Sequence, residues 1–428
     1  GFSTLVGGSA TGAGGSFLPS FSFAFTASAM SFSSCIFLAF SVATAASLTL
    51  SSSSLLICFA LLCEAAGYDV LVSDIREDYV NDLNNRKIVT NEPEVENLLR
   101  TAKNFRATTN NKEVINECDL IYTLVATPSK EDGSYDVSSV YNVVDDFSDI
   151  TSIKYFVVGC TVNPGDCDKF KEKLSRNIKV FYNPEFIAQG SIINDLRTAD
   201  MVLLGSNPHE DNDKIIHDIK TLYQKIQTTR AIVCNMSTTA AEITKIGVNC
   251  FLTTKISYAN MLGDVLHLSG CGDEVSGLLS AIGTDSRIGR KYLGYGFGYG
   301  GPCLPRDNRA FAAFAKNLGL EYNLGHVTDE INNQHAKFVC DFYVKVNSKK
   351  LPFYFDSITY KKNTDILTES QQYRLCKDLL DMGYKVYIRN DVRVTPQVCD
   401  ELLDKYGENA QFVDDKKYIT EPVFIVNV

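Results

Sequence analysis

Four short apolar runs, each ending in a polar turn, constrain the fold of this chain most strongly. They cover residues 119–126, 154–159, 179–182 and 201–205. Buried runs of this length at intervals along a chain are typical of strands in a parallel sheet. The carboxyl ends of parallel strands meet at one edge of a sheet, where ligands bind. We therefore expect Thr127, Thr161 and Glu185, which follow three of these runs, to be neighbours.

A helix-to-strand step comes before these runs. Residues 56–66 predict a helix that ends at Gly67, and residues 69–73 predict a strand that ends on Asp74. This order predicts a doubly wound α/β domain over residues 55–235. Asp74 also lies where a dinucleotide-binding fold places the acidic ligand of its ribose.

Residues 1–54 differ in character from the rest. No charged residue occurs before residue 64, and the segment shows neither helical nor strand periodicity. A signal peptide needs a basic start, and a spanning helix needs about 20 apolar residues, so we expect no membrane role. We interpret the segment as an atypical leader in the place of a first strand and glycine loop. Gly12, Gly14 and Gly15 are too far from Asp74 to form that loop, and no glycine occurs between Gly15 and Gly67.

Composition excludes several classes of protein. The 428 residues are enough for two or three domains. The 13 cysteines and 5 histidines show no metal-type spacing, so we expect neither a metal site nor a disulfide framework and favour a cytoplasmic location. A net charge of -10 without a Lys/Arg block argues against a nucleic-acid partner.

The stretch after residue 236 predicts a long helix. Residues 237–267 carry apolar side chains at helical spacing, with Ser237 or Thr238 as a possible cap, and residues 274–282 predict a second helix. Lys245 and Asn249 lie at i and i+4 on one face of the long helix. We assign residues 236–335 to a central helical domain whose long helix joins two domains and suits a dimer contact.

The run from Gly294 to Asp307 packs five glycines against one cysteine. Glycines permit positive φ and let a ligand approach the main-chain N–H groups. Cys303 is then a candidate nucleophile, and Asp307 returns to the same place if residues 310–318 form a helix. A glycine-rich loop with an inert cysteine remains the alternative at this point.

Residues 336–428 predict a further, shortened α/β domain. Residues 353–358 and 385–389 predict strands, residues 370–382 predict a helix, and residues 338–345 fit a helix or a strand. Lys361 begins a basic turn that either faces a diphosphate or is simply solvated.

Four motifs in order resemble the UDP-glucose and GDP-mannose dehydrogenase family. They are CTVNP at 160–164, NPEFIAQG at 183–190, AEITK at 241–245 followed by Asn249, and FGYGGPCLPRD at 297–307. The resemblance covers residues 55–389, and the cysteine loop has the form found in UDP-glucose members. Arg306 stands where lysine is usual, and Thr368 stands where arginine is expected.

The resemblance implies a fold and an activity. The fold would be two Rossmann-like doubly wound domains joined by a long central helix. The activity would be the four-electron oxidation of a nucleotide sugar, UDP-glucose above all, by two NAD in a homodimer or larger assembly. GDP-mannose and UDP-N-acetylhexosamines are alternative substrates. A non-catalytic homologue that lost NAD binding with its glycine loop is the alternative from another class.

The resemblance also implies roles for particular residues. Catalytic roles fall to Cys303, Lys245, Asp307, Asn249, Glu185 and Thr161. Cofactor contacts fall to Asp74, Thr127, Pro128, Thr161 and Arg306. Substrate contacts fall to Phe186, Glu185, Lys245, Asn249, Tyr295, Phe297, Gly298, Gly300, Arg287 and Lys361. Cys303 would attack an aldehyde and form a thioester, Glu185 would activate the hydrolytic water, and Arg287 would reach the partner subunit's substrate.

Overall fold

The computed structural model describes residues 35–39, 46–361 and 364–426, with side chains from Ser54 onward. Gly12, Gly14 and Gly15 lie outside these residues, as do residues 40–45 and residues 362–363 of the predicted basic turn. No helix within the described ranges is both long enough and apolar enough to cross a membrane.

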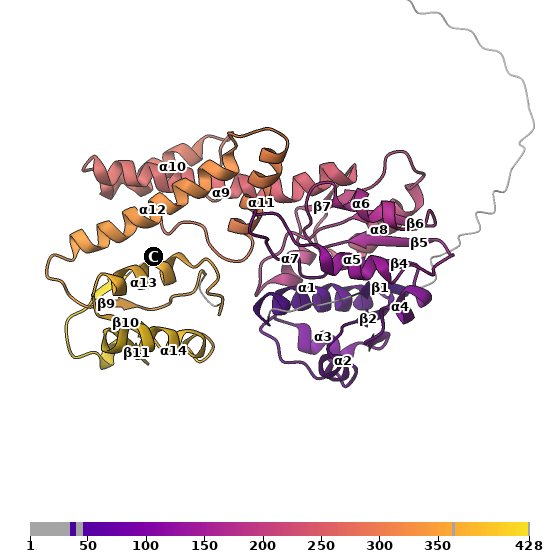
Figure 1. Cartoon of the computed structure of the whole chain (residues 1–428), viewed down its shortest axis with the longest axis horizontal. Helices are drawn as coiled ribbons and strands as arrows, with labels where there is room; N and C mark the ends of the chain where they lie inside the picture. Colours follow the sequence, from indigo (N-terminus) through magenta and orange to yellow (C-terminus); the bar gives the residue numbers. More distant parts are fainter. Residues whose placement is uncertain (1–34, 40–45, 362–363, 427–428) are drawn as a thin grey trace, which may run out of the picture. The chain divides into compact units, whose positions relative to one another are not determined.

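An eight-stranded sheet organises the first part of the chain (Figure 1). Its strand order is β3-β2-β1-β4-β5-β6-β7-β8, and neighbouring strands are parallel except β6 and β7. The strands are β1 (Cys35–Ala39), β2 (Asp69–Ser73), β3 (Phe105–Thr108), β4 (Leu120–Thr123), β5 (Lys154–Val158), β6 (Ile178–Tyr182), β7 (Met201–Gly205) and β8 (Ile232–Met236). The doubly wound α/β prediction is therefore confirmed. The strand order reverses between β1 and β4, which is where such a sheet opens a ligand crevice.

Eight helices accompany this sheet among the described residues. They are α1 (Ala46–Ala65), α2 (Glu77–Asn84), α3 (Val95–Thr101), α4 (Asn111–Glu117), α5 (Ser138–Asp145), α6 (Asp166–Lys173), α7 (Ile192–Arg197) and α8 (Asp213–Ile226). The stretch of α1 from residue 56 to residue 63 is buried on all sides, since each of its residues is at most 3% exposed. An apolar helix of this kind belongs to the interior of a domain.

The start of α1 was predicted ten residues too late. The helix begins at Ala46 rather than at residue 56, and β1 pairs with both β2 and β4 inside the segment interpreted as a leader. Residues 46–55 include five serines and one threonine, which have weak helix propensity, so no helical signal marked this part of the helix. The limits of the domains stay predictions.

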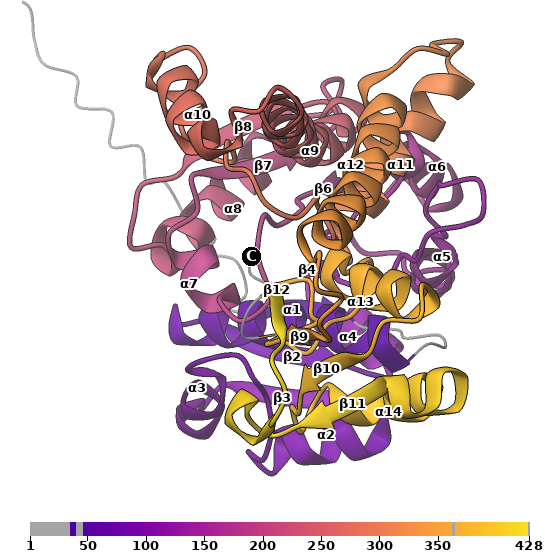
Figure 2. The same cartoon turned by 90° about the vertical axis from the view of Figure 1, so that its left-hand side faces the viewer.

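Four helices build the central part of the chain. They are α9 (Thr238–Leu268), α10 (Val275–Thr284), α11 (Leu304–Asn317) and α12 (Leu324–Val346), with a short 3-10 turn at Gly272–Glu274 before α10. The long helix predicted from residue 237 is confirmed, and Ser237 caps it by accepting the Ala240 N–H at 3.4 Å. Helices α11 and α12 both pack along α9 (Figures 1 and 2). Residues 338–345 belong to α12 and are therefore helical.

A four-stranded parallel sheet organises the last part of the chain. Its order is β11-β10-β9-β12, with β9 (Phe353–Phe355), β10 (Val386–Arg389), β11 (Ala410–Val413) and β12 (Phe424–Val426). Helices α13 (Gln371–Asp381) and α14 (Thr395–Tyr406) and 3-10 turns at Gly407–Asn409 and Lys416–Tyr418 complete it. The strand predicted over residues 353–358 is shorter than expected and ends at Phe355.

Two glycines of the cysteine loop pack tightly against the segment before α13. A Cβ atom on Gly300 would lie 2.3 Å from the Glu369 carbonyl oxygen, and one on Gly301, at φ +82°, would lie 2.5 Å from the Tyr360 ring. The Gly301 N–H also donates to the Thr368 carbonyl oxygen at 3.1 Å. By contrast, a Cβ atom on Gly294 or Gly296 would meet nothing within 4 Å. These two glycines therefore leave open space beside the loop.

This packing predicts unequal effects of adding one methyl group. Gly300→Ala should lower the free energy of unfolding by about 1 to 3 kcal/mol, because the methyl group overlaps a backbone carbonyl that cannot rotate away. Gly294→Ala is the matched control and should change it by less than about 0.5 kcal/mol. Urea unfolding of both variants measures the difference, and equal stabilities would contradict the packing described.

Candidate active site

Cys303 stands at the N-terminal end of α11. It is the N-cap residue, it is exposed, and its carbonyl oxygen accepts the Asp307 backbone N–H at 2.9 Å. A helix N-terminus carries a partial positive charge that favours a thiolate. The helix predicted over residues 310–318 begins earlier, at Leu304, and brings Cys303 and Asp307 into one turn.

Neighbouring charges act on the Cys303 thiol in opposite directions. Loss of water around the sulfur raises the pKa of Cys303 above its ordinary value. Arg306 and Lys245 lower that pKa, whereas Asp307 raises it further. The thiol is therefore protonated in the absence of a substrate. A base, or a bound substrate that alters the charges around the sulfur, favours its ionisation.

The Asp307 carboxylate is buried and accepts three hydrogen bonds. Its Oδ2 accepts Asn249 Nδ2 at 2.6 Å, and its Oδ1 accepts the Tyr135 hydroxyl at 2.7 Å and Arg306 Nε at 3.3 Å. Only 1% of its surface is exposed. An unpaired carboxylate in such a place would be costly, so these donors hold Asp307 in one orientation.

Lys245 faces the same region from α9. Its Nζ donates to the Glu185 carbonyl oxygen at 2.6 Å and lies 4.4 Å from the centre of the Phe186 ring. Burial lowers the pKa of Lys245, while the charges of Asp307 and Cys303 raise it in part. This amine can exchange a proton closer to neutral pH than an exposed lysine.

Glu185 has the opposite shift from the same cause. Burial raises its pKa to about 7, and a hydrogen bond from Tyr223 together with the charge of Lys245 keeps it from rising further. A carboxyl group that titrates near 7 can both accept and return a proton at physiological pH.

A chain of hydroxyl groups backs Glu185. The Tyr223 hydroxyl contacts Glu185 Oε1 and also lies 2.8 Å from Asn183 Oδ1, which accepts the Tyr122 hydroxyl at 3.1 Å. Tyr223 has one proton to donate, so it bonds both acceptors only when Glu185 is protonated and donates to it. When Glu185 ionises, Tyr223 can turn its proton toward the carboxylate.

The predicted strand-end residues form a second part of the cluster. Thr127 Oγ1 donates to the Thr161 carbonyl oxygen at 2.7 Å, and Arg306 Nη1 donates to the Thr127 carbonyl oxygen at 3.4 Å. Pro128 accepts the Asp136 N–H at 2.7 Å through its carbonyl oxygen. Thr127 and Thr161 are thus neighbours as expected, and Glu185 joins them only indirectly, through its electrostatic contact with Lys245 and that of Lys245 with Asp307.

Two predicted substrate residues lie apart from this cluster. The Arg287 side chain is 86% exposed and pairs with Asp285 at 2.6 Å, and Lys361 is exposed beyond β9. Among the described residues, neither side chain makes a hydrogen bond or ion pair with the residues around Cys303. The assignment of Arg287 depended on the family resemblance, and the basic turn at Lys361 left a solvated turn as its alternative.

The predicted substrate residues of the glycine loop are held by neighbouring helices. The Tyr295 hydroxyl donates to Asp264 Oδ1 at 2.9 Å, and the Phe297 carbonyl oxygen accepts Asn260 Nδ2 at 3.4 Å. A Cβ atom on Gly298 would lie 2.1 Å from Asn332 Oδ1. Gly298 therefore packs against α12 and Gly300 against the segment before α13, and their contact with a substrate stays a prediction.

The edge of the large sheet offers groups that fit a dinucleotide. Asp74, at the end of β2, is fully buried, and its two oxygens accept Arg76 Nε at 3.0 Å and Nη2 at 2.7 Å. At the end of β4, Thr123 Oγ1 is buried and has no hydrogen-bond partner among the described residues. A carboxylate at the end of β2 suits ribose hydroxyls. Thr123 borders the point where the strand order reverses, and β2 lies one strand away from that point, beyond β1. The segment between β1 and α1, residues 40–45, lies outside the described residues.

Two tyrosines at the site were missed by sequence reasoning. Tyr135 reaches Asp307 from the segment after β4, and Tyr223 reaches Glu185 from α8. Neither belongs to a motif. Tyr223 lies on the apolar face of an amphipathic helix, where a tyrosine is normally interpreted as a core residue. Only the three-dimensional contact identifies the hydroxyl groups.

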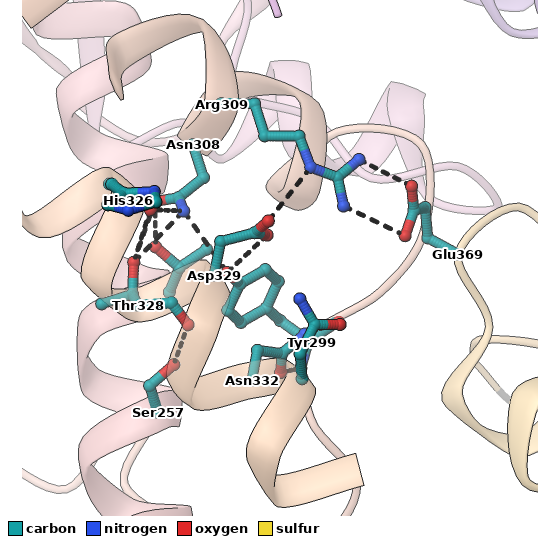
Figure 3. Close-up of polar contacts among 12 residues, drawn as sticks. Ser257, Tyr299, Asn308, Arg309, His326, Thr328, Asp329, Asn332 and Glu369 are labelled. Carbon is teal, nitrogen blue, oxygen red and sulfur yellow. Dashed lines mark hydrogen bonds and ion pairs between the residues drawn. The ribbon is translucent and has the colours of Figure 1, made fainter. Parts of the chain in front are cut away.

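A polar network around Asn308 and Arg309 holds α11 against its neighbours (Figure 3). Asn308 Nδ2 donates to Thr328 Oγ1 at 3.1 Å, and Arg309 bridges Asp329 at 3.3 Å and Glu369 at 2.7 Å. These residues directly follow Asp307 on the helix. They therefore tie the helix that carries Cys303 and Asp307 to α12 and to the segment before α13.

Two domains of one protein family match this chain in sequence. The NAD binding domain of the UDP-glucose/GDP-mannose dehydrogenase family matches residues 55–227, and the central domain of that family matches residues 239–334. Together they cover more than half of the chain and include Cys303, Lys245, Asp307, Asn249 and Glu185.

Individual relatives are distant but extensive. UDP-glucose 6-dehydrogenase TuaD of Bacillus subtilis (strain 168) is 29% identical over 370 residues, covering 84% of this chain and 76% of that protein. UDP-glucose 6-dehydrogenase of Drosophila melanogaster is 28% identical over 358 residues, covering 78% and 74%. A UDP-glucose dehydrogenase structure from the archaeon Pyrobaculum islandicum aligns with a TM-score of 0.74 at 24% identity, covering 89% and 86%, which shows a shared fold.

The contact between Tyr223 and Glu185 predicts a pKa change. Tyr223→Phe removes a donor that favours the carboxylate, so the pKa of Glu185 should rise above about 7. Infrared titration of the Glu185 carboxyl band, identified by its loss in Glu185→Gln, measures the shift. Tyr122→Phe is the matched control, because that hydroxyl bonds Asn183 instead. An unchanged or lower pKa in Tyr223→Phe would contradict the assignment.

Proposed function

We propose that this chain, which belongs to the UDP-glucose/GDP-mannose dehydrogenase family, oxidises UDP-glucose to UDP-glucuronate with two molecules of NAD. Members of this family are NAD-dependent nucleotide-sugar dehydrogenases. The observation that carries the proposal is one connected cluster of Cys303, Lys245, Asp307 and Asn249 beside Glu185. The choice of UDP-glucose follows the relatives, whose names specify that sugar nucleotide.

The first oxidation turns the C6 alcohol of the sugar into an aldehyde. NAD supplies the hydride acceptor for both oxidations. Asp307 is oriented by three donors and can take the alcohol proton through a water molecule. The Lys245 cation stabilises the oxyanion that develops as this proton leaves. Asp74 and the strand-end residues Thr127 and Thr161 are the groups that would hold the dinucleotide.

The second oxidation requires a covalent bond to Cys303. The thiolate adds to the aldehyde carbon, and the resulting thiohemiacetal loses a hydride to become a thioester. Lys245 and Asn249 are placed to donate to the oxygen that carries negative charge during addition. The N-terminal end of α11 favours the thiolate form.

Hydrolysis of the thioester completes the reaction. Glu185, with a pKa of about 7, accepts a proton from the attacking water, Thr161 holds that water, and Cys303 leaves as a thiolate. One alcohol, one water and two NAD⁺ thereby yield one carboxylate, two NADH and three protons. Glu185, whose pKa is about 7, then releases this proton at physiological pH, which resets the site.

An exposed apolar stripe on α9 supports a homodimer. Phe251, Tyr258 and Val265 recur every seven residues and are 64%, 45% and 51% exposed. A stripe of this kind on a long helix suits a second copy of the chain, and Arg287 could then reach the partner's substrate.

Val265→Asp should dissociate the dimer in analytical ultracentrifugation. A wild-type chain that sediments as a monomer at 10 µM or above would contradict the homodimer.

A cytoplasmic location fits this chemistry. The described cysteines carry no disulfide bonds, and Cys303 must stay reduced to act as a nucleophile. A reducing compartment meets that requirement.

Replacing Cys303 tests the function. Wild-type protein should produce two NADH for each UDP-glucose consumed, and Cys303→Ser should lower steady NADH production about 1,000-fold or more. Cys271→Ser, at another exposed cysteine, is the matched control and should keep the wild-type rate. Two-hydride turnover by Cys303→Ser at the wild-type rate would refute the thioester step.

Binding measurements separate the remaining alternatives. Calorimetric titration with NAD tests whether the chain is a non-catalytic homologue. The absence of binding at millimolar NAD would favour a homologue that has lost its cofactor. Measurement of kcat/KM with GDP-mannose and UDP-N-acetylhexosamines tests the substrate assignment. A higher kcat/KM for one of these than for UDP-glucose would identify that nucleotide sugar as the substrate instead.

A further inference from the structure

We propose that His335 is a positioning residue that, protonated on both ring nitrogens, holds the glycine loop in the conformation that receives the sugar. The loop is defined here as residues Gly294 to Gly301. The sugar contact rests on the proposed function, whereas the proton on His335 and its hold on the loop do not.

The His335 side chain lies between α9 and the glycine loop. Its Nδ1 is 2.8 Å from Asp264 Oδ2, and its Nε2 is 2.7 Å from the Gly296 carbonyl oxygen. The side chain is only 1% exposed. Water therefore does not replace either partner, and both contacts must be satisfied by the imidazole itself.

Counting protons assigns the charge of His335. The Gly296 carbonyl can only accept a hydrogen bond, and an ionised Asp264 carboxylate can only accept as well. The Tyr295 hydroxyl donates to the other oxygen of Asp264, Oδ1, at 2.9 Å. Both ring nitrogens of His335 must then carry hydrogen, which makes the ring an imidazolium paired with Asp264.

Two amide side chains hold the loop beside His335, and neither can titrate. Asn260 Oδ1 accepts the Gly296 N–H at 3.1 Å, and Asn332 bonds the N–H and the carbonyl oxygen of Tyr299 at 2.9 and 3.0 Å. His335 is one turn from Asn332 on α12. Of the three side chains Asn260, Asn332 and His335, only His335 can carry a charge.

Other charged and titratable groups surround His335 from three directions. Asp264 and His267 approach from α9, and Tyr295 approaches from the loop, with its ring 5.6 Å from His335 and 5.4 Å from His267. From α13, Arg374 and Asp378 border the same small gap as His335. Their opposite charges offset each other, so Asp264 is the charge that decides the state of His335.

Loss of the proton would release part of the loop. A neutral imidazole can donate from one nitrogen only, so either Gly296 or Asp264 would face a lone pair. Gly296 stands where the loop leaves open space, seven residues before Cys303 in the chain. A looser Gly296 should weaken substrate binding and change the chemistry at Cys303 little.

The test combines a direct view of the proton with kinetics. Nitrogen-15 NMR of histidine-labelled wild-type protein should show both His335 nitrogens protonated at pH 7, identified by their loss in His335→Gln. Glutamine keeps one donor for Gly296 but no charge. His335→Gln should raise the KM for UDP-glucose about tenfold at pH 7 and change kcat less than about threefold.

A matched control distinguishes the hold of His335 on the loop from a general effect on α12. His326→Gln, on the same helix but 63% exposed and paired with Glu330, should keep the wild-type KM. A KM in His335→Gln that equals the wild-type value at pH 7 would overturn the proposal.

Two measurements need no turnover and so separate this inference from the proposed function. Hydrogen exchange of the Gly296 to Gly300 amides should be faster in His335→Gln than in wild-type protein at pH 7. A neutral His335 in the wild-type NMR spectrum at pH 7, or equal hydrogen-exchange rates in both proteins, would refute the proposal that His335 holds the loop. Failure to oxidise UDP-glucose, with the imidazolium and the exchange difference present, would refute the proposed function alone.

Discussion

The candidate active site depends on the buried carboxylate of Asp307. A carboxylate that is 1% exposed is tolerable only with good hydrogen-bond donors, and it has Asn249, Tyr135 and Arg306. These donors come from α9, from the segment after β4 and from α11 itself. Leaving Asp307 without these hydrogen bonds would cost free energy, so the carboxylate holds the three stretches together. Cys303 stays one helical turn from Asp307.

Burial then sets the acid–base character of the groups nearby. The same loss of solvent raises the pKa of Glu185 to about 7 and lowers the pKa of Lys245. Two groups that would be permanently charged at the surface are thus brought toward neutrality from opposite sides. Proton transfer at physiological pH becomes accessible without a histidine in the cluster.

Sequence patterns predicted the parts of the molecule whose signal is local. The strands from β4 to β7 and helix α9 were found because short apolar runs and a long helical period are visible in the chain itself. The start of helix α1 was placed too late because residues 46–55 are rich in serine, which has weak helix propensity. Tyr135, Tyr223 and the His335 contact were not foreseen, because each depends on two residues that are distant in sequence and belong to no motif.

The most direct measurement is capture of the acyl group on Cys303. Glu185→Gln, mixed with UDP-glucose and NAD and quenched in acid, should carry a UDP-glucuronyl thioester on the peptide that contains Cys303, detected by mass spectrometry and released by hydroxylamine. Slow hydrolysis in this variant lets the adduct accumulate. Formation of UDP-glucuronate at the wild-type rate without any adduct, or an adduct on another cysteine, would contradict the account.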